Sequence, residues 1–513
     1  MEQQNEESKI INRINKVVDF FKQIKNIRNH INKRMEGKYS STLIALVATA
    51  IATVLMISML FLPHYLGVAD DGSISKVMNS AGVYYMQSEI ADVYNNYFVK
   101  TYSNVISGYQ TKDTLINSQI MIVKAAVYLD NLVTRDRYFD IRFLGLIYSI
   151  FYVPAIYLLI KQACMRVKVF SEGFVIGFAG ILVFADVGYI TYFNSFYPEA
   201  LWFISLMYCI AAALSFQEKR SANRDFLSLL MIIIAGIVLT TSRSQTAFIA
   251  ILLAVFCLKL LFVRQNWMWG LICVMSAFLL SFVAIICMIN MNSDYDTTSK
   301  FHAMTRGVLL ESSDPGETLS EFGIDSSYEM LADASSFDYL PIVQATDEVL
   351  TDGFLNQYTQ IDIALYYAKH PGSFLSMIDV AMKYCFNTRR EYCGNYEKSV
   401  GFPERAKSFF WGAWGNFKSN SLPKTIGYFF FLVGVVVIQF KKGYSIRHFE
   451  ERRSTIFLDT MIVIALICLC QAAITIVNSG DAEMVRHSFL ISFGIDLITY
   501  YAFSEVIHRI NIF

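Results

Sequence analysis

Charge is scarce in this chain. Only 17% of its 513 residues are Asp, Glu, Lys or Arg, whereas 55% are hydrophobic, a balance that few soluble globular proteins have. The sequence also lacks a Cys and His cluster with zinc spacing, a Gly-rich phosphate loop and a basic-aromatic pattern typical of nucleic-acid binding. We therefore expect no required cofactor, no metal site and no nucleic-acid partner.

The nine cysteines do not suggest a disulfide framework. Seven fall in apolar runs and are expected to act as small hydrophobic side chains: Cys164, Cys209, Cys257, Cys273, Cys287, Cys468 and Cys470. Cys385 and Cys393 lie together in a polar stretch. Their spacing leaves open whether they form a disulfide or stay as free thiols.

The hydrophobic residues occur in runs of about 20 residues, the length of a helix that spans a bilayer. We predict an all-α polytopic membrane protein with ten transmembrane helices, near 42–62, 141–160, 172–190, 199–216, 226–241, 246–262, 267–291, 425–440, 454–477 and 488–506. The first span lacks a small-residue cleavage site and is too long for a signal-peptide core, so we expect it to stay uncleaved. The two halves of the chain show no internal repeat of the kind found in inverted-repeat transporters.

Lys and Arg alternate between the short loops in the manner of the positive-inside rule. Clusters mark the loops predicted to lie inside: Lys161/Arg166/Lys168, Lys219/Arg220/Arg224, Lys259/Arg264 and Lys441/Lys442/Arg447/Arg452/Arg453. The short loops predicted to lie outside carry almost none besides Arg243 and Arg486. This pattern predicts a multi-pass protein of the bacterial cytoplasmic membrane, with both termini cytoplasmic.

The predicted spans divide the chain into four parts. Residues 1–40 form a basic segment with apolar residues at helical spacing, which indicates an amphipathic helix on the anionic inner leaflet or a solvated tail. Residues 41–291 hold spans 1 to 7 with the first extracytoplasmic loop, 63–140. Residues 292–424 form a large extracytoplasmic loop, and residues 425–513 hold spans 8 to 10. Both long loops show helical spacing that predicts juxtamembrane helices, within Met78–Val105, Ile116–Leu132, Gln360–Tyr367 and Phe374–Tyr384.

Two adjacent acids, Asp70 and Asp71, follow the outer end of the first span. Two like charges are unfavourable near the low-dielectric membrane, which suggests a use for them. A carboxylate at that depth could meet both a lipid-borne phosphate and a water-borne hydroxyl. The alternative is that Asp and Gly72 simply form a turn after the helix.

Further polar residues gather near the outer ends of the spans: Asp186, Asn194, Tyr197, Glu199, Arg243, Gln245, Asp481, Glu483, Arg486 and His487. A charge at the membrane interface costs several kcal/mol when it is unpaired, so such residues are candidates for function. Arg243 and Arg486 could bind an anion, or they could pair with acids such as Asp186 and Glu199 and hold spans together.

The chain resembles the GT-C class of membrane glycosyltransferases, and within that class the WsfD-like bacterial hexose transferases of surface-glycan biosynthesis. The residues that carry the resemblance run in order across the chain: Asp70-Asp71-Gly72 with Lys76-Val77-Met78-Asn79, Tyr192–Glu199, Ser242-Arg243-Ser244-Gln245, Tyr366–Pro371, Gly394–Glu397 and Glu483–His487. The resemblance implies an acid in the first outer loop and a sugar donor linked to polyprenyl phosphate. It implies transfer of a hexose, with inversion, to a surface glycan or lipid-linked acceptor at the outer face.

The expected site follows from this chemistry. Asp71, or alternatively Asp70, would accept the proton of the acceptor hydroxyl. The leaving lipid phosphate would be neutralised by cationic side chains: Arg243, Arg486, His487 and Lys76. The substrate pocket is expected to include Asn194, Tyr197, Glu199, Gln245 and Asp186. A divalent metal at the two acids would need further converging carboxylates, and none is predicted.

Two other functional classes remain open at the level of sequence. A transporter of lipid-linked oligosaccharide would also need many spans and outward-facing cations, but charges buried at mid-span would favour it. An O-antigen-type polymerase or ligase also reads lipid phosphate with outer arginines and places its largest outer loop late in the chain, but it needs no acid pair after the first span.

Overall fold

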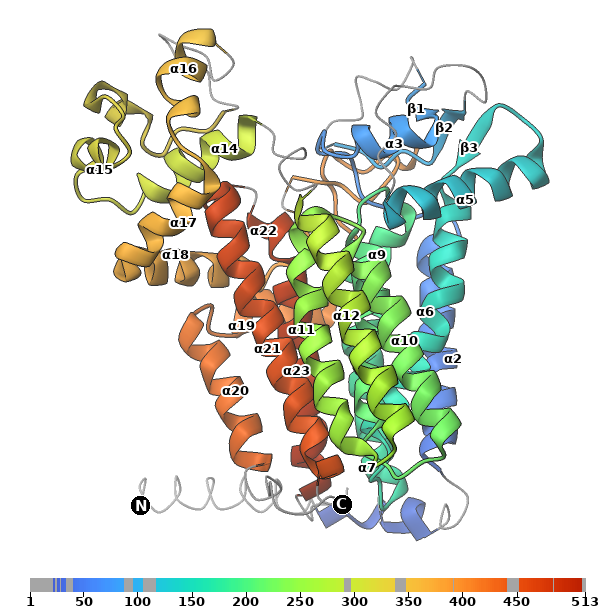
Figure 1. The fold of residues 1–513 in the computed structure, drawn as a ribbon. Coiled ribbons are helices and arrows are strands. Elements are labelled where there is room, and N and C mark those ends of the chain that lie inside the picture. Colours follow the sequence, from blue (N-terminus) through green and yellow to red (C-terminus); the bar gives the residue numbers. More distant parts are fainter. Residues whose placement is uncertain are drawn as a thin grey trace, which may run out of the picture.

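The computed structural model describes residues 22–23, 25–27, 29–33, 40–86, 96–104, 117–289, 297–336, 347–390, 392–440, 452–482 and 484–509. Long helices form an upright bundle, and two lobes rise from one end of it (Figure 1). The bundle helices are α2 (Ser41–Leu60), α6 (Arg142–Ala163), α7 (Phe170–Phe184), α9 (Glu199–Ser215), α10 (Ala222–Thr240), α11 (Ala247–Lys259), α12 (Trp267–Ile289), α20 (Ile426–Phe440), α21 (Arg452–Ser479) and α23 (Phe489–Arg509). A helix therefore lies at each of the ten predicted ranges.

Not all of these helices are long enough to cross a membrane alone. Six pass by length and composition, and the number among the described residues rises to eight when two bent helix pairs each count as one span. The other two, α9 and α11, are shorter apolar helices of 17 and 13 residues. The multi-pass membrane character is thus confirmed, whereas the count of ten spans stays a prediction.

α9 lies at the centre of the bundle. All of its residues except Tyr208 are buried, and it packs against α6, α10, α21 and α23. A helix that is apolar on every side must be enclosed by other helices. Glu199, the first residue of α9, is therefore held in place at the end of the bundle that carries the lobes.

The two bent pairs bring polar backbone into the upper part of the bundle. α7 is followed by the short helix α8 (Val187–Ile190) after a bend of 43°, and α19 (Ala413–Ser421) leads into α20 through a bend of 115°. Asp186 lies at the first bend and caps α8, because its Oδ1 accepts a hydrogen bond from the Gly188 N–H at 2.7 Å. Its Oδ2 accepts one from the Gly415 N–H at 2.9 Å, which ties α19 to the same point.

Lys418 of α19 inserts a positive charge among the bundle helices. Its ammonium lies 2.8 Å from Asp496 Oδ2 and donates to Ser492 Oγ at 2.8 Å, both on α23. The Tyr189 hydroxyl donates to the same Asp496 oxygen at 2.5 Å. Both charged side chains are fully shielded from solvent, so the pair is one positive and one negative charge sealed together.

The first lobe comprises α3 (Ser75–Ala81), α5 (Ser118–Thr134) and an antiparallel sheet in the order β1 (Val83–Tyr84), β2 (Thr101–Asn104), β3 (Tyr138–Asp140). α5 confirms the helix predicted over Ile116–Leu132 from Ser118 onward, whereas the helix predicted over Met78–Val105, part of which lies outside the described residues, is not confirmed. The short helix α3 ends at Ala81 because the next residue, Gly82, adopts a left-handed backbone conformation with φ of 75°. Aromatic and β-branched residues then favour the strands. The fold is predominantly helical, as predicted, with this small sheet in addition.

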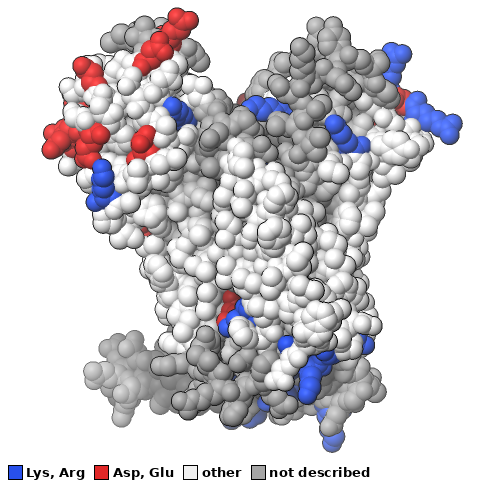
Figure 2. Space-filling model, viewed as in Figure 1, with Lys and Arg blue, Asp and Glu red and all other residues white. Residues whose placement is uncertain are grey.

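The second lobe is helical and acidic. It contains α14 (Thr297–Ala303), a π-helical turn (η4, Met304–Val308), α15 (Pro315–Glu321), η5 (Ser326–Leu331), α16 (Glu348–Gly353), α17 (Gln360–Lys369) and α18 (Pro371–Tyr384). The last two confirm the amphipathic helices predicted in this loop. Figure 2 shows acidic side chains gathered over this lobe and a notch between it and the first lobe.

The opposite end of the bundle carries the described members of the Lys and Arg clusters on which the predicted sidedness depends, while Lys441, Lys442 and Arg447 lie outside the described residues. Blue side chains mark this end in Figure 2. Most of the basic segment 1–40 lies outside the described residues, but 29–33 is helical, and Asn32 exchanges two hydrogen bonds of 3.0 Å with Ser171 at the start of α7. Which side of the membrane each end faces stays a prediction.

Candidate functional site

The loop after α2 is fixed by a buried side chain from the 192–199 segment. Asn194 Nδ2 donates to the carbonyl of Leu60 at 3.2 Å and to that of Leu66 at 2.9 Å. Buried backbone carbonyls need such partners where a helix ends. Asn194, predicted to line a substrate pocket, thus holds the entrance to the acidic loop.

A second segment pairs with the same loop through backbone hydrogen bonds. The Gly67 N–H donates to the carbonyl of Asn395 at 3.1 Å, and the Ala69 N–H donates to that of Gly394 at 3.0 Å. Asn395 Nδ2 also donates to the Gly67 carbonyl at 2.7 Å. The loop that leads to the predicted acids at 70–72 therefore lies beside the predicted segments 192–199 and 394–397.

Asp71 is bound on every side. Its Oδ1 accepts hydrogen bonds from the Ser73 N–H at 3.0 Å and the Ser73 hydroxyl at 2.6 Å, and its Oδ2 lies 2.5 Å from Arg390 Nη1. The Asp71 N–H donates to the Tyr197 hydroxyl, which itself donates to the Ala69 carbonyl, both at 2.9 Å. Both carboxylate oxygens of Asp71 are therefore engaged.

Arg390 bridges two acids. Its second nitrogen, Nη2, lies 2.6 Å from Glu199 Oε1, and its guanidinium stacks 3.9 Å from the centre of the Tyr197 ring. The side chains of Arg390, Asp71 and Glu199 are 0%, 2% and 1% exposed. Burial acts against the charge of Arg390, but the neighbouring acids raise its pKa well above the usual value.

This charged group, Asp71–Arg390–Glu199, joins two carboxylates to one guanidinium through two buried ion pairs. Glu199 Oε2 and Arg390 Nε are buried and have no hydrogen-bond partner among the residues that the structure describes. Buried polar atoms are rarely left without a partner, so these two mark a place where a further group would fit.

Asp70 differs from its neighbour. It is 4% exposed, and its oxygens accept hydrogen bonds from the Gly72 N–H at 2.7 Å and the Tyr85 hydroxyl at 2.6 Å. It forms no ion pair with any described residue. Burial raises the pKa of Asp70, and the charge of Asp71 adds to this effect, while the two hydrogen bonds oppose it. Asp70 is thus the more basic kind of carboxylate.

The turn that carries Arg243 joins the same end of the bundle through aromatic contacts. Next to it, Ser242 Oγ accepts a hydrogen bond from the Trp202 indole at 2.7 Å. The Trp202 ring lies 6.5 Å from that of Phe489, which lies 5.3 Å from that of Tyr192. Tyr192 in turn packs 6.2 Å from Tyr197, the ring under Arg390. Arg243 itself is half-buried.

The other residues predicted to bind phosphate or line the pocket differ in how deeply they are buried. His487 is buried in α22 (Met484–His487), next to Phe489, and its carbonyl accepts a hydrogen bond from Gln471 at 3.3 Å. Gln245 is half-buried in the turn Ser244–Thr246 (η2), and Lys76 is exposed on α3. The side chain of Arg486, and Glu483, lie outside the described residues. Asp186 holds the bends of the bundle, as described above.

Three residues near the site were not predicted from the sequence: Arg389, Arg390 and Tyr85. Arg389 is half-buried, donates to the Ser408 carbonyl and lies 5.6 Å from the Phe409 ring. Burial lowers the pKa of Arg389, while Asp186 acts in the opposite direction. The adjacent pair Arg389-Arg390 was a usable signal, because it places two cations together in a loop predicted to lie outside.

A cavity of about 670 Å³ opens beside this site. Its lining includes Tyr97, Phe98, Lys100, Tyr138, Glu397 and Ser399. The Phe98 ring also lies against Gly67, three residues before Asp70, so closely that a Cβ at Gly67 would lie 2.1 Å from it. Phe98 therefore contacts the loop that leads to Asp70 and is also part of the cavity lining.

The structure also bears on metal and disulfide chemistry. Within the described ranges, no group of three or more His, Cys, Asp and Glu side chains is arranged to hold a metal ion. Cys385 and Cys393 are both buried free thiols, and burial raises the pKa of Cys393 to about 12. They do not form the disulfide that the sequence left open.

The bundle and its apolar helices define a multi-pass membrane protein. Over residues 22–513 the chain matches the family described as YfdI N-terminal transmembrane domain, and it belongs to that family. No curated protein matches the chain.

Proposed function

We propose that this protein is an inverting glycosyltransferase of the outer face of the membrane, which moves a hexose from a polyprenyl-phosphate carrier to a surface glycan or a lipid-linked acceptor. The observation that carries the proposal is Asp70, a buried carboxylate without a cationic partner among the described residues, beside the Asp71–Arg390–Glu199 group. The family supports the membrane location in this proposal, because it is described as a transmembrane domain.

The geometry supports Asp70, rather than Asp71, as the general base. Both oxygens of Asp71 are engaged by Ser73 and Arg390, whereas Asp70 accepts a hydrogen bond from Tyr85, which is half-buried. In the proposed step, Asp70 takes the proton of the acceptor hydroxyl. The acceptor oxygen then forms a bond to the anomeric carbon, the bond from that carbon to the phosphate oxygen breaks, and the lipid phosphate leaves with the electron pair. One displacement inverts the anomeric configuration.

The leaving phosphate needs positive charge around it. Arg389, half-buried and without an ion pair among the described residues, joins the proposed donor site with Arg243, Arg486 and His487. Arg390 is a positioning residue in this scheme, because its charge is already shared by two acids. Its role is to hold Asp71, and through it the Asp70 backbone, in place.

The cavity lined by Tyr97, Phe98 and Tyr138 is our proposed acceptor site. Aromatic rings beside charged and hydroxyl groups suit a sugar, which presents an apolar face and a rim of hydroxyls. Lys100 and Glu397, 3.8 Å apart, supply a donor and an acceptor in this cavity. A glycan bound here would approach Asp70 past the Phe98 ring.

Charges buried at mid-span would favour the transporter alternative, and Asp496 of α23 is one such charge. It is, however, neutralised by Lys418 and hydrogen-bonded by Tyr189, so it forms a closed structural pair and not an ion or substrate path. The buried acid pair after the first span favours a transferase over a polymerase or ligase.

Turnover of a defined donor tests the proposed class. Purified protein in nanodiscs would receive a series of synthetic polyprenyl-phosphate hexoses and a native membrane glycan fraction, and released polyprenyl phosphate would be measured by mass spectrometry. A transferase releases the lipid phosphate in proportion to glycan labelled. A transporter leaves the donor intact, and a polymerase or ligase uses no monosaccharide donor of this kind. Either of those results would contradict the proposal.

A further inference from the structure

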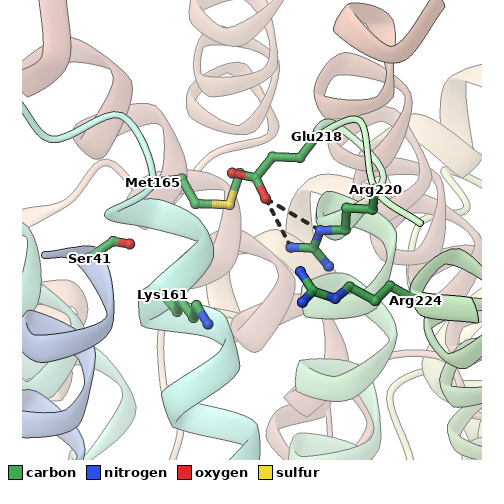
Figure 3. Close-up of a pocket in the computed structure, with 6 residues that line it drawn as sticks. All are labelled: Ser41, Lys161, Met165, Glu218, Arg220 and Arg224. Carbon is green, nitrogen blue, oxygen red and sulfur yellow. Dashed lines mark hydrogen bonds and ion pairs between the residues drawn. The ribbon is translucent and has the colours of Figure 1, made fainter.

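A second cavity lies at the end of the bundle opposite the lobes. It has a volume of about 270 Å³ and is lined by Ser41, Lys161, Met165, Glu218, Arg220 and Arg224 (Figure 3). These residues come from the first turn of α2, the end of α6, the α9–α10 connection and the first turn of α10. Each of the three helices passes as a membrane span, so the cavity lies level with the membrane surface.

The charges in this cavity are unequal. Lys161, Arg220 and Arg224 contribute three positive charges, and Glu218 contributes one negative charge, 3.3 Å from Arg220. Neither Lys161 nor Arg224 forms an ion pair with any residue that the structure describes; Lys161 lies over the Tyr157 ring at 5.4 Å. Figure 3 shows the Arg220 and Arg224 guanidinium groups turned toward the space that Lys161 borders. Like charges around one small cavity repel each other unless an anion lies between them.

The donors suit a phosphoryl group. The Arg224 guanidinium can bind two phosphate oxygens, whereas Arg220 donates from Nε and Nη2 to Glu218 Oε2 at 3.3 Å and has Nη1 left for an anion. Lys161 adds a point charge, and the Ser41 hydroxyl adds a neutral donor. α2 begins at Ser41, so the positive end of its dipole lies at this cavity, although Ser40 Oγ already accepts the hydrogen bond of the Leu43 N–H at 3.1 Å. Basic pockets between spans on the cytoplasmic side are typical sites for anionic lipid headgroups, and this end of the bundle is the one predicted to be cytoplasmic.

We propose that the Lys161–Arg220–Arg224 cavity is a binding site for a phosphoryl group at the inner membrane surface, separate from the transfer site at the other end of the bundle. Two sources share this chemistry: the headgroup of an anionic phospholipid and free phosphate. This binding site does not depend on the proposed transfer reaction, so it can be tested by ligand binding without an activity assay.

The test is ligand binding to the full-length protein in an uncharged detergent. Dioleoyl phosphatidylglycerol, dioleoyl phosphatidylcholine and inorganic phosphate would be titrated separately, with native mass spectrometry and thermal melting as readouts. The variant Lys161→Gln/Arg224→Gln should bind phosphatidylglycerol about tenfold more weakly than the wild type. The matched control Lys124→Gln/Arg137→Gln removes two exposed charges from the first lobe and should bind as the wild type does.

Each outcome assigns or removes the site. Variant-sensitive binding of phosphatidylglycerol that phosphate does not displace assigns a lipid headgroup, and displacement by inorganic phosphate assigns the free anion. Equal binding by wild type and variant overturns the proposal, as does equal loss in the control. If the double variant melts early without ligand, the single variant Arg224→Gln decides, because Arg224 is exposed and no packing depends on it.

Discussion

The Asp71–Arg390–Glu199 group and the Lys418–Asp496 pair are both buried, but they differ in the number of acidic side chains that share each basic side chain. The pair inside the bundle joins one cation to one anion, and Tyr189 and Ser492 add hydrogen bonds. The group at the lobe end of the bundle joins one cation to two anions, and Asp70 lies next to Asp71 in the chain. An oxygen of Asp496 also lacks a partner among the described residues, so the number of acids that share the cation, not hydrogen bonding, separates the two.

This difference indicates what each cluster is for. A balanced buried pair fixes the position of one helix against another, here α19 against α23, and gains little from any further group. A cluster of two acids around one cation keeps a second carboxylate buried at a real energetic cost, which a protein tolerates where a substrate or a proton later compensates for it. The predictions below separate the two clusters by removing their charges one at a time.

The largest effect should follow removal of Arg390. Arg390→Met leaves Asp71 and Glu199 buried without their cation, so we expect the free energy of unfolding to fall by about 3–5 kcal/mol. Thermal melting in detergent measures the loss. Glu199→Gln added to Arg390→Met should recover only part of it, since Asp71 remains charged. Melting of Arg390→Met at the wild-type temperature would contradict the charge arrangement described here.

Removal of Lys418 should cost less, and one further change should reverse it. Lys418→Met leaves a single buried carboxylate, Asp496, in place of two. The double variant Lys418→Met/Asp496→Leu replaces the pair with apolar groups, an exchange that is often neutral or stabilising by about 1–4 kcal/mol. We expect its melting temperature to return to the wild-type value and its transfer activity to be retained. Loss of activity in this well-folded double variant would give the pair a functional role that we do not assign to it.

The pH dependence of transfer should report Asp70. Because burial raises its pKa, Asp70 becomes an ionised base only above the usual carboxyl range, and the rate should rise with pH through that raised value. The free energy of unfolding should change in the opposite direction. Because Asp70 has a higher pKa in the folded protein than in the unfolded chain, its protonation stabilises the fold. That stabilisation is fully present below the usual carboxyl pKa and is lost as the pH rises through the raised pKa of the folded protein. Rate and melting temperature measured from pH 4 upward should therefore change in opposite directions. A rate that is flat across this range would argue against Asp70 as the base.

The smallest effect should come from Tyr85. Tyr85→Phe removes a hydrogen bond that stabilises ionised Asp70, so the pKa of Asp70 should rise further and the acidic limb of the rate profile should move up by about one pH unit. At high pH the rate should stay near that of the wild type. Tyr97→Phe is the matched control, because it removes a hydroxyl from the proposed acceptor cavity and not from the neighbourhood of Asp70. It should leave the acidic limb of the rate profile at the wild-type pH.

The sequence predicted the bundle better than it predicted the site. Long uncharged runs locate helices because the membrane imposes one length and one polarity, so α2 and α23 could be drawn within a few residues. The helix expected beyond Met78 failed, because a single left-handed Gly82 ends it and tertiary pairing of β1 to β3 overrides helical spacing. Local propensity carries no information about such pairing.

The sequence predicted the acidic residues of the candidate site but did not predict the arginine that pairs with two of them. Asp70, Glu199 and Asn194 stood out because they lie at the ends of spans, where a polar residue is unexpected. Arg390 lies 319 residues after Asp71 in the chain. It is part of a long polar loop, where an arginine is expected and gives no signal of a functional site. Only the fold, which packs residues 394–396 against the loop after α2, brings that arginine between the two acids.

The central claim is that the Asp70 carboxylate accepts the proton from the sugar acceptor, and single-turnover transfer by two neighbouring variants tests it most directly. Asp70→Asn should slow release of polyprenyl phosphate by about 10²–10⁴-fold, with donor binding and melting temperature kept. Asp71→Asn should keep more of the rate, because Arg390 still pairs with Glu199, and Glu348→Gln, an exposed acid of the second lobe, should keep all of it. Wild-type transfer by Asp70→Asn in well-folded protein would contradict the account.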